Sequence, residues 1–294
     1  MSRPVPAPAD PVVVGVDDGL LRRRVLDRAV AEARRRAAPL HLVHTHGPET
    51  PLAPWQDDAG RRAGSYLART APDLDVTLDC RAGDTTDVLV GACGPGSLLI
   101  LGDRHRRLAS EAGQTTARAI EAAPCPVVVI PEYRGPTPPG TVVRRAVVVG
   151  VDDGPAAASV VAYALRAAAG HDARLEAVRV IVPATGREAA DVPPAEVDRA
   201  HRELDALVDA ARRHGPAVPV ETSVVVDRPA RVLLERAEGA EELVVGHRRH
   251  ADPTLRGPGS TARSVLLGMT SPVTVLGPRG RDGAPVTVAA EDAR

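Results

Sequence analysis

One phrase of eight residues, Val-Val-Val-Gly-Val-Asp-Asp-Gly, occurs twice in the chain, at residues 12–19 and again at residues 147–154. A second landmark repeats in the same order, an aliphatic run ending in Gly102 in the first copy and in Gly246 in the second. The copies are 147 − 12 = 135 residues apart at the phrase and 246 − 102 = 144 apart at the glycine, so the second copy is longer. Repeats of this size indicate two similar globular domains, because the repeats of solenoid proteins are far shorter.

The composition supports two domains with aliphatic cores. The chain has 294 residues, enough for two ordinary domains, and 44% of them are hydrophobic although Phe is absent. A net charge of −1 gives no general attraction to nucleic acid or to a membrane surface. The start lacks the apolar segment of a signal peptide, and Cys80, Cys93 and Cys125 show no metal-binding spacing, so we expect a cytoplasmic protein.

The chain contains no lysine, so all 37 basic residues of the Lys and Arg class are arginines. A P-loop nucleotidase and a protein kinase each need a lysine on the phosphates, and a Schiff-base enzyme needs one as its nucleophile. The sequence therefore excludes these three classes of protein.

Short apolar runs alternate with helical segments along both copies. We expect strands at residues 12–16, 40–46, 75–80, 98–101 and 127–130, and then at 147–151, 175–181, 220–226, 243–245 and 273–276. Helices are expected at residues 20–38, 57–70, 85–93 and 114–123, and then at 156–169, 195–214, 230–237 and 260–267. This alternation predicts an α/β fold with one doubly wound, five-stranded parallel sheet in each repeat.

Domain boundaries follow from composition. We expect a disordered N-terminus at residues 1–11, a first domain at 12–131 and a proline-stiffened linker at 132–143. A second domain is expected at residues 144–278, followed by a flexible tail at 279–294.

Ligands of such sheets bind beyond the carboxyl ends of the strands, where the strand order reverses. After the fourth strand of repeat two comes Gly246, then Arg249, then nine residues before Gly259 and Ser260 open a helix. Glycine lets a phosphate approach the backbone, and the start of a helix offers free amides and a hydroxyl. The alternative is that Gly259 and Ser260 form only an ordinary helix cap.

An aspartate ends the first strand of each repeat, Asp17 in the first and Asp152 in the second. Such a carboxylate can accept a hydrogen bond from a ribose hydroxyl. The alternative is a solvated turn, because Asp-Asp-Gly is a favourable turn sequence.

The chain resembles the universal stress proteins in their tandem, two-domain form, over residues 12–131 and 147–278. The likeness rests on Val-Gly-Val-Asp after each first strand, the glycine after each fourth strand, and Pro-Cys-Pro-Val-Val-Val at residues 124–129. It implies a Rossmann-like fold, similar to the adenine nucleotide α hydrolase-like proteins, with strand order 3-2-1-4-5. It also implies ATP binding through Gly-x2-Gly-x9-Gly-Ser/Thr, and pairing of fifth strands within one chain or in a homodimer.

The two repeats depart differently from that motif. Repeat two keeps the nine-residue spacing but has Arg249 in place of the second glycine, whereas repeat one has His105 there, a loop two residues shorter, and Gln114 after Gly113. We therefore expect repeat two to be the better site for ATP, with or without Mg. The predicted nucleotide-binding residues are Asp152, Val180, Gly246, Arg249, Gly259 and Ser260 in repeat two, and Asp17, Gly102 and Gly113 in repeat one.

Two histidine-containing patterns have simpler interpretations. His41, His44 and His46 have no carboxylate or cysteine at ligand spacing nearby, and only His44 and His46 share a strand face, so we predict no metal site. Basic loops at residues 104–107 and 247–250 either attract phosphate or are merely solvated, and the sequence leaves both open.

No nucleophile with a partner base is evident, so we do not expect a dedicated enzyme. The leading hypothesis is a nucleotide-binding stress-response module without strong catalysis, whose protein partner the sequence does not identify. One alternative is an interaction scaffold with degenerate nucleotide sites in both repeats, and another is a slow ATPase using Asp152 and Ser260.

Overall fold

The computed structural model describes residues 10–17, 23–46, 58–103, 111–131, 144–184, 188–247 and 259–277. The predicted linker, the tail, most of the N-terminus and Arg249 lie outside these residues. None of the described helices is both long enough and apolar enough to span a membrane.

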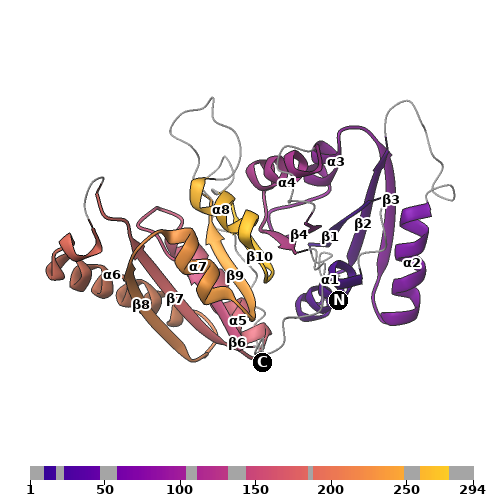
Figure 1. The fold of residues 1–294 in the computed structure, drawn as a ribbon. Coiled ribbons are helices and arrows are strands. Elements are labelled where there is room, and N and C mark those ends of the chain that lie inside the picture. Colours follow the sequence, from indigo (N-terminus) through magenta and orange to yellow (C-terminus); the bar gives the residue numbers. More distant parts are fainter. Residues whose placement is uncertain are drawn as a thin grey trace.

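Strands and helices alternate in both repeats, as the sequence predicts (Figure 1). Repeat one contains β1 (Val12–Val16), α1 (Arg23–Arg36), β2 (Leu40–His46), α2 (Asp58–Thr70), β3 (Val76–Ala82), α3 (Thr85–Gly91), β4 (Leu98–Gly102), α4 (Glu111–Ala122) and β5 (Val127–Ile130). Repeat two contains β6 (Arg144–Gly150), α5 (Ala157–Gly170), β7 (Arg174–Ile181), the 3-10 helix η3 (Ala189–Asp191), α6 (Pro194–Arg212), β8 (Val220–Val226), α7 (Pro229–Ala237), β9 (Ala240–Gly246), α8 (Ser260–Gly268) and β10 (Val273–Leu276).

The strands form one ten-stranded sheet with the order β3-β2-β1-β4-β5-β10-β9-β6-β7-β8. Each repeat supplies five parallel strands in the predicted order 3-2-1-4-5. The repeats join through β5 and β10, which pair antiparallel with Val128 opposite Thr274. We call this junction the seam. The two predicted sheets are therefore halves of one continuous sheet.

Helices cover both faces of this sheet (Figure 1). On one face, α1 and α2 pack on repeat one and α5 and α6 on repeat two, as two separate apolar clusters. On the other face a single apolar cluster runs through both repeats and includes Val127, Val129, Val273 and Val275 of the seam. The two domains thus share part of their core.

The first strand of each repeat shows why its sequence is apolar throughout. Val12, Val13 and Val14 are all 0% exposed, with Val13 in the shared cluster and its two neighbours in the cluster of the opposite face. A strand covered on both faces has no side free for polar residues. In β6, the first strand of repeat two, the final glycine leaves room for a leucine of α7. A Cβ at Gly150 would lie 2.8 Å from Leu233 Cδ1.

Some boundaries differ from the predicted ones. Helix α4 begins at Glu111, three residues earlier than expected, and β9 begins at Ala240 rather than at residue 243. Strand β6 also begins three residues early, where Arg144 contacts Glu176 and donates to the Arg236 carbonyl at 2.7 Å. These extensions use charged residues, which the search for apolar runs passes over.

Candidate functional site

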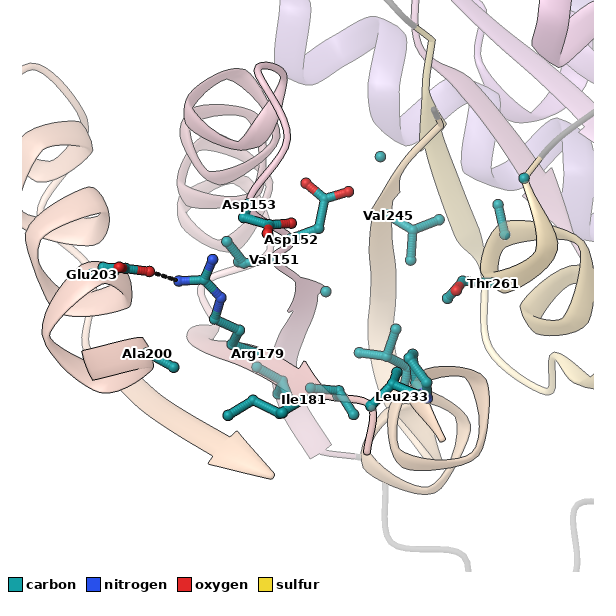
Figure 2. Close-up of a pocket in the computed structure, with 18 of the residues that line it drawn as sticks. Val151, Asp152, Asp153, Arg179, Ile181, Ala200, Glu203, Leu233, Val245 and Thr261 are labelled. Carbon is teal, nitrogen blue, oxygen red and sulfur yellow. Dashed lines mark hydrogen bonds and ion pairs between the residues drawn. The ribbon is translucent and has the colours of Figure 1, made fainter. Parts of the chain in front are cut away.

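A cavity of about 640 Å³ opens at the carboxyl ends of β6, β7 and β9 in repeat two (Figure 2). Strand β6 lies between β7, which follows it in sequence, and β9, so the strand order reverses here. This is where an open α/β sheet places its ligand, and the volume is in the range of ordinary small-molecule sites.

Five of the six residues predicted for repeat two line this cavity together. They come from the ends of three strands and from the start of one helix: Asp152, Val180, Gly246, Gly259 and Ser260. The sixth, Arg249, lies outside the described residues. The structure therefore brings the predicted residues into one place, while their role as nucleotide ligands stays a prediction.

Asp152 has the turn role that its sequence predicts, and its role as a partner of a ribose hydroxyl stays a prediction. It lines the cavity, and its Oδ1 accepts a hydrogen bond from the amide of Gly154 at 2.9 Å. This bond closes the turn between β6 and α5, which is the structural role that the Asp-Asp-Gly sequence favours. In Figure 2, the Asp152 carboxylate lies across the cavity from Thr261, with Val245 of β9 between them.

The start of α8 differs in one respect from the expected set of free amides. Gly259 precedes the helix, and its N–H donates to Nδ1 of His247 at 3.3 Å. That amide is already used, which leaves Ser260, Thr261 and Ala262 as the cavity-lining residues of the first turn. Part of the expected anion site is therefore occupied by a side chain of the same chain.

His247 itself corrects the interpretation of the basic loop. It is only 2% exposed, so it neither attracts phosphate from the surface nor belongs to a solvated loop. Its position is fixed because its amide donates to the Leu276 carbonyl at 2.8 Å. The other residues of that loop, 248–250, lie outside the described residues.

Helix α6 forms a wall of the cavity that the sequence did not reveal. Arg179 of β7 reaches Glu203 of α6, with Nη1 2.8 Å from Oε2, and only 14% of the arginine side chain is exposed (Figure 2). Glu196 and Arg199 lie on the same wall. The available signal was the Glu and Arg spacing along α6, which is 19 residues long where its counterpart α2 has 13.

Charge is divided unevenly around the cavity. The carboxylates that line it are Asp152 and Asp153 in the β6–α5 turn and Glu196 and Glu203 on α6, and two arginines, Arg179 and Arg199, lie on β7 and on α6. The lining residues from α7, β9 and α8 include no carboxylate, and α8 offers the hydroxyls of Ser260 and Thr261. A ligand with one anionic end and one neutral, hydroxyl-bearing end matches this division.

The equivalent position in repeat one is different. Strand register makes Thr45 the counterpart of Val180, and the common offset of 144 makes Thr85 the counterpart of Pro229. The two threonine hydroxyls lie 2.8 Å apart. A polar bridge thus replaces two apolar residues of the cavity wall.

The remaining predicted residues of repeat one are only partly aligned for binding. Asp17 and Gly102 lie at the carboxyl ends of β1 and β4, as expected. Gly113 does not open a helix, because α4 begins two residues before it at Glu111. This agrees with repeat one being the lesser candidate.

No cysteine or carboxylate lies at ligand spacing from the histidines of β2 along the sequence, but the fold brings one of each beside them. Register places Cys80 beside His44, with Sγ 4.0 Å from Nδ1, and Asp79 Oδ2 lies 3.7 Å from His41 Nε2. His41 and His44 lie on opposite faces of β2. The two contacts are therefore separate pairs.

Comparison with known proteins agrees with this architecture. The profile of the Universal stress protein family matches residues 8–131 and again residues 144–277. The chain belongs to the universal stress protein family. A universal stress protein of Mycobacterium tuberculosis is 28% identical over 297 aligned positions, covering 90% of this chain and 95% of that protein. One from Mycolicibacterium smegmatis is 26% identical over 294 positions, covering 91% and 97%.

Solved structures show the same fold. A universal stress protein from Archaeoglobus fulgidus superposes with a TM-score of 0.63 at 16% identity, covering 94% of this chain and 98% of that one. A universal stress protein in complex with cAMP matches 46% of this chain and 98% of that one at 27% identity, with a TM-score of 0.36. That similarity is too low to extend the cAMP ligand to this protein.

Proposed function

We propose that repeat two of this tandem universal stress protein binds an adenine nucleotide, with ATP as the preferred ligand. The observation that carries the proposal is the meeting of Asp152, Val180, Gly246 and Ser260 around one cavity at the strand-order reversal. These residues come from the ends of β6, β7 and β9 and the start of α8, so they meet only because the fold places these ends around one cavity.

The charge division sets the direction of the ligand. The phosphates would lie against the first turn of α8, where amides and hydroxyls are donors and the helix dipole favours negative charge. The ribose and base would lie toward Asp152 and Val180, because a carboxylate accepts hydrogen bonds from hydroxyls and a valine offers an apolar surface. A reversed ligand would place the phosphates among four carboxylates and two arginines, Arg179 and Arg199, where negative charge is in excess.

Mg²⁺ fits the same arrangement when it enters with the nucleotide. Phosphate oxygens are among its usual ligands, so it would enter bound to the nucleotide. The hydroxyls of Ser260 and Thr261 would lie beside the metal-bound phosphates. The metal would supply charge neutralisation rather than a separate protein site.

We infer binding without strong catalysis. Among the cavity carboxylates, Asp152 already accepts from Gly154 and Glu203 is paired with Arg179. A general base has to be placed on the attacking group, and two of the four cavity carboxylates are held by other partners. The protein would act through the molecules that it binds when nucleotide is present in the cavity.

The alternative function is a scaffold that has kept the fold and lost the ligand. The observation favouring it is that the Gly259 amide is used by His247, in a loop where Arg249 also replaces a motif glycine. Replacement Arg249→Gly distinguishes the two. An increase in ATP affinity means that the site was obstructed, whereas no binding by either protein supports the scaffold.

Isothermal titration of the full chain with Mg-ATP tests the proposal. We expect one site per chain, weakened in Ser260→Ala and Asp152→Ala. The matched control is Asp17→Ala, the same change at the same position of repeat one, which should leave the affinity unchanged. Absence of binding at millimolar ATP by correctly folded protein would reject the proposal.

A further inference from the structure

A group of charged side chains is buried where the two repeats meet, on the α1 and α5 face of the sheet. At its centre is Glu242 of β9, which is 0% exposed. Its carboxylate is contacted by Arg28 of α1, accepts a hydrogen bond from Thr274 Oγ1 at 2.5 Å, and lies 3.4 Å from His171 Nε2. Arg28 thus comes from one repeat and the other three from the second.

A second buried carboxylate completes the group. Glu32 of α1 is 1% exposed, with Oε1 3.1 Å from Arg28 Nη2, and its other oxygen contacts Arg35. Arg35 also crosses the end of α5, since a Cβ at Gly170 would lie 2.2 Å from its Cδ. The carbonyl end of a helix favours such a cation.

These residues could be mistaken for a metal site. Ligand atoms of Glu32, His171 and Glu242 lie within 4.8 Å of one another. However, the Arg28 guanidinium contacts both carboxylates, and Arg35 contacts one of them. The positive charge that the carboxylates need is already present, so a divalent ion would have to displace it.

The group is not repeated by the pseudo-twofold relation between the repeats. At the common offset of 135, Arg28 corresponds to Tyr163 and Glu32 to Ala167. At the offset of 144, Glu242 corresponds to Leu98, which is also 0% exposed. The position of Arg28 therefore carries an arginine only in repeat one, and the position of Glu242 a carboxylate only in repeat two.

Without this asymmetry, the seam could equally well join two copies of the same repeat. Val128 and Thr274 face each other and are counterparts at the offset of 146, so they mark the pseudo-twofold axis. Two copies of repeat two would bring α5, with Tyr163, against each Glu242. Two copies of repeat one would bring Arg28 against Leu98. The first pairing would leave each buried Glu242 without its arginine, with only His171 and Thr274 beside it. The second would leave Arg28 with Glu32 alone. Removing one member of a buried ion pair is strongly unfavourable.

We propose that the β9, β10 and α5 surface of repeat two selects repeat one as its partner through the Arg28–Glu242 pair and rejects a second copy of itself. The fifth strands of the two repeats, β5 and β10, are then paired with each other within one chain. A second copy of the chain would have to associate through another surface, because homotypic pairing of repeat two at the seam deprives both Glu242 carboxylates of their arginine.

Charge reversal in the full chain tests this selection. We expect Arg28→Glu and Glu242→Arg each to reduce hydrogen-exchange protection of the β5 and β10 amides by about a hundredfold or more, because each opposes like charges in a buried site. Protection of β1 and β4 in repeat one should persist. The double variant Arg28→Glu/Glu242→Arg should regain most of the seam protection. The matched control is Arg34→Glu, the same change on α1 at an exposed residue paired with Asp73 inside repeat one.

The test remains decisive even if one of the single variants fails to fold. If Glu242→Arg unfolds repeat two, recovery in the double variant still supports the proposal. Unchanged seam protection in Arg28→Glu, or a double variant no better than the single ones, would overturn it. Native mass spectrometry adds a second readout. The Arg28→Glu chain should remain monomeric, and a homodimer in which β10 regains protection would also overturn the proposal.

Discussion

Arg179 of β7 and Glu203 of α6 form an ion pair, 2.8 Å between Nη1 and Oε2, that ties the sheet to the helix along one wall of the cavity. The arginine side chain is 14% exposed and the glutamate 54%, so the pair is partly screened by solvent. It therefore positions α6 beside the proposed nucleotide site more than it stabilises the domain.

Replacing Glu203 by glutamine should have a small effect on stability. Partly exposed pairs are worth up to about 1 kcal/mol, so we expect urea unfolding to show a loss of that order. The control is Glu235→Gln on α7, whose partner Arg231 is 64% exposed at 2.9 Å. A loss several times larger in Glu203→Gln would mean that the pair holds the domain together.

The variant Asp152→Asn separates the role of Asp152 in the β6–α5 turn from its proposed role in nucleotide binding. Asparagine keeps an oxygen for the Gly154 amide, so the free energy of unfolding should change by less than about 0.5 kcal/mol, whereas Asp152→Ala should lose about 1 kcal/mol with the hydrogen bond. Both should weaken ATP binding, measured by titration. Full ATP affinity in Asp152→Asn would show that the charge of the Asp152 carboxylate does not contribute to binding.

Glu242 makes stability depend on pH at the acidic end. Burial alone would raise its pKa, but the charge of Arg28 and contacts from His171 and Thr274 outweigh it and lower the pKa from 4.5 to about 2. A lowered pKa gives stability that is present above pH 4.5 and is lost as pH falls toward 2. The contribution is of the order of 3 kcal/mol.

Urea unfolding between pH 2 and pH 6 checks this dependence against Glu242→Gln. The variant should be less stable than the wild type near neutral pH, and the difference should shrink as the solution becomes acidic. A difference that is constant over this range would show that Glu242 is not ionised in the folded protein.

Two glycines should respond oppositely to alanine. In Gly150→Ala the new Cβ would lie 2.8 Å from Leu233 Cδ1, so we expect a loss of about 1–3 kcal/mol from overpacking. In Gly64→Ala, inside α2, nothing lies within 4 Å of the new Cβ, so stability should rise by about 0.5–1 kcal/mol. Thermal unfolding of both variants measures the contrast, and equal losses would contradict the packing explanation.

Much of the fold was predictable because its central strands are covered on both faces. The buried strands β1, β5 and β10 have the predicted bounds, and so do β2 and the half-buried edge strand β8. An apolar run of four to seven residues between turn signals is distinctive when both faces are buried. The order of the strands followed from family resemblance and is confirmed.

The unpredicted features depend on residues brought together by register or by the other repeat. Glu242 resembles a surface residue in sequence, yet it is buried, and the arginine that balances its charge, Arg28, is 242 − 28 = 214 positions away. His247 resembles part of a basic loop, yet it is buried and accepts from Gly259. Single-sequence patterns carry no information about such partners.

A crystal structure of the full chain grown with a non-hydrolysable ATP analogue tests most directly whether the cavity between β6, β9 and α8 receives a nucleotide. We predict phosphates against the first turn of α8 at Ser260 and the ribose within hydrogen-bonding distance of Asp152. A well-ordered structure at saturating analogue with only solvent in that cavity, or with the ligand bound elsewhere, would contradict it.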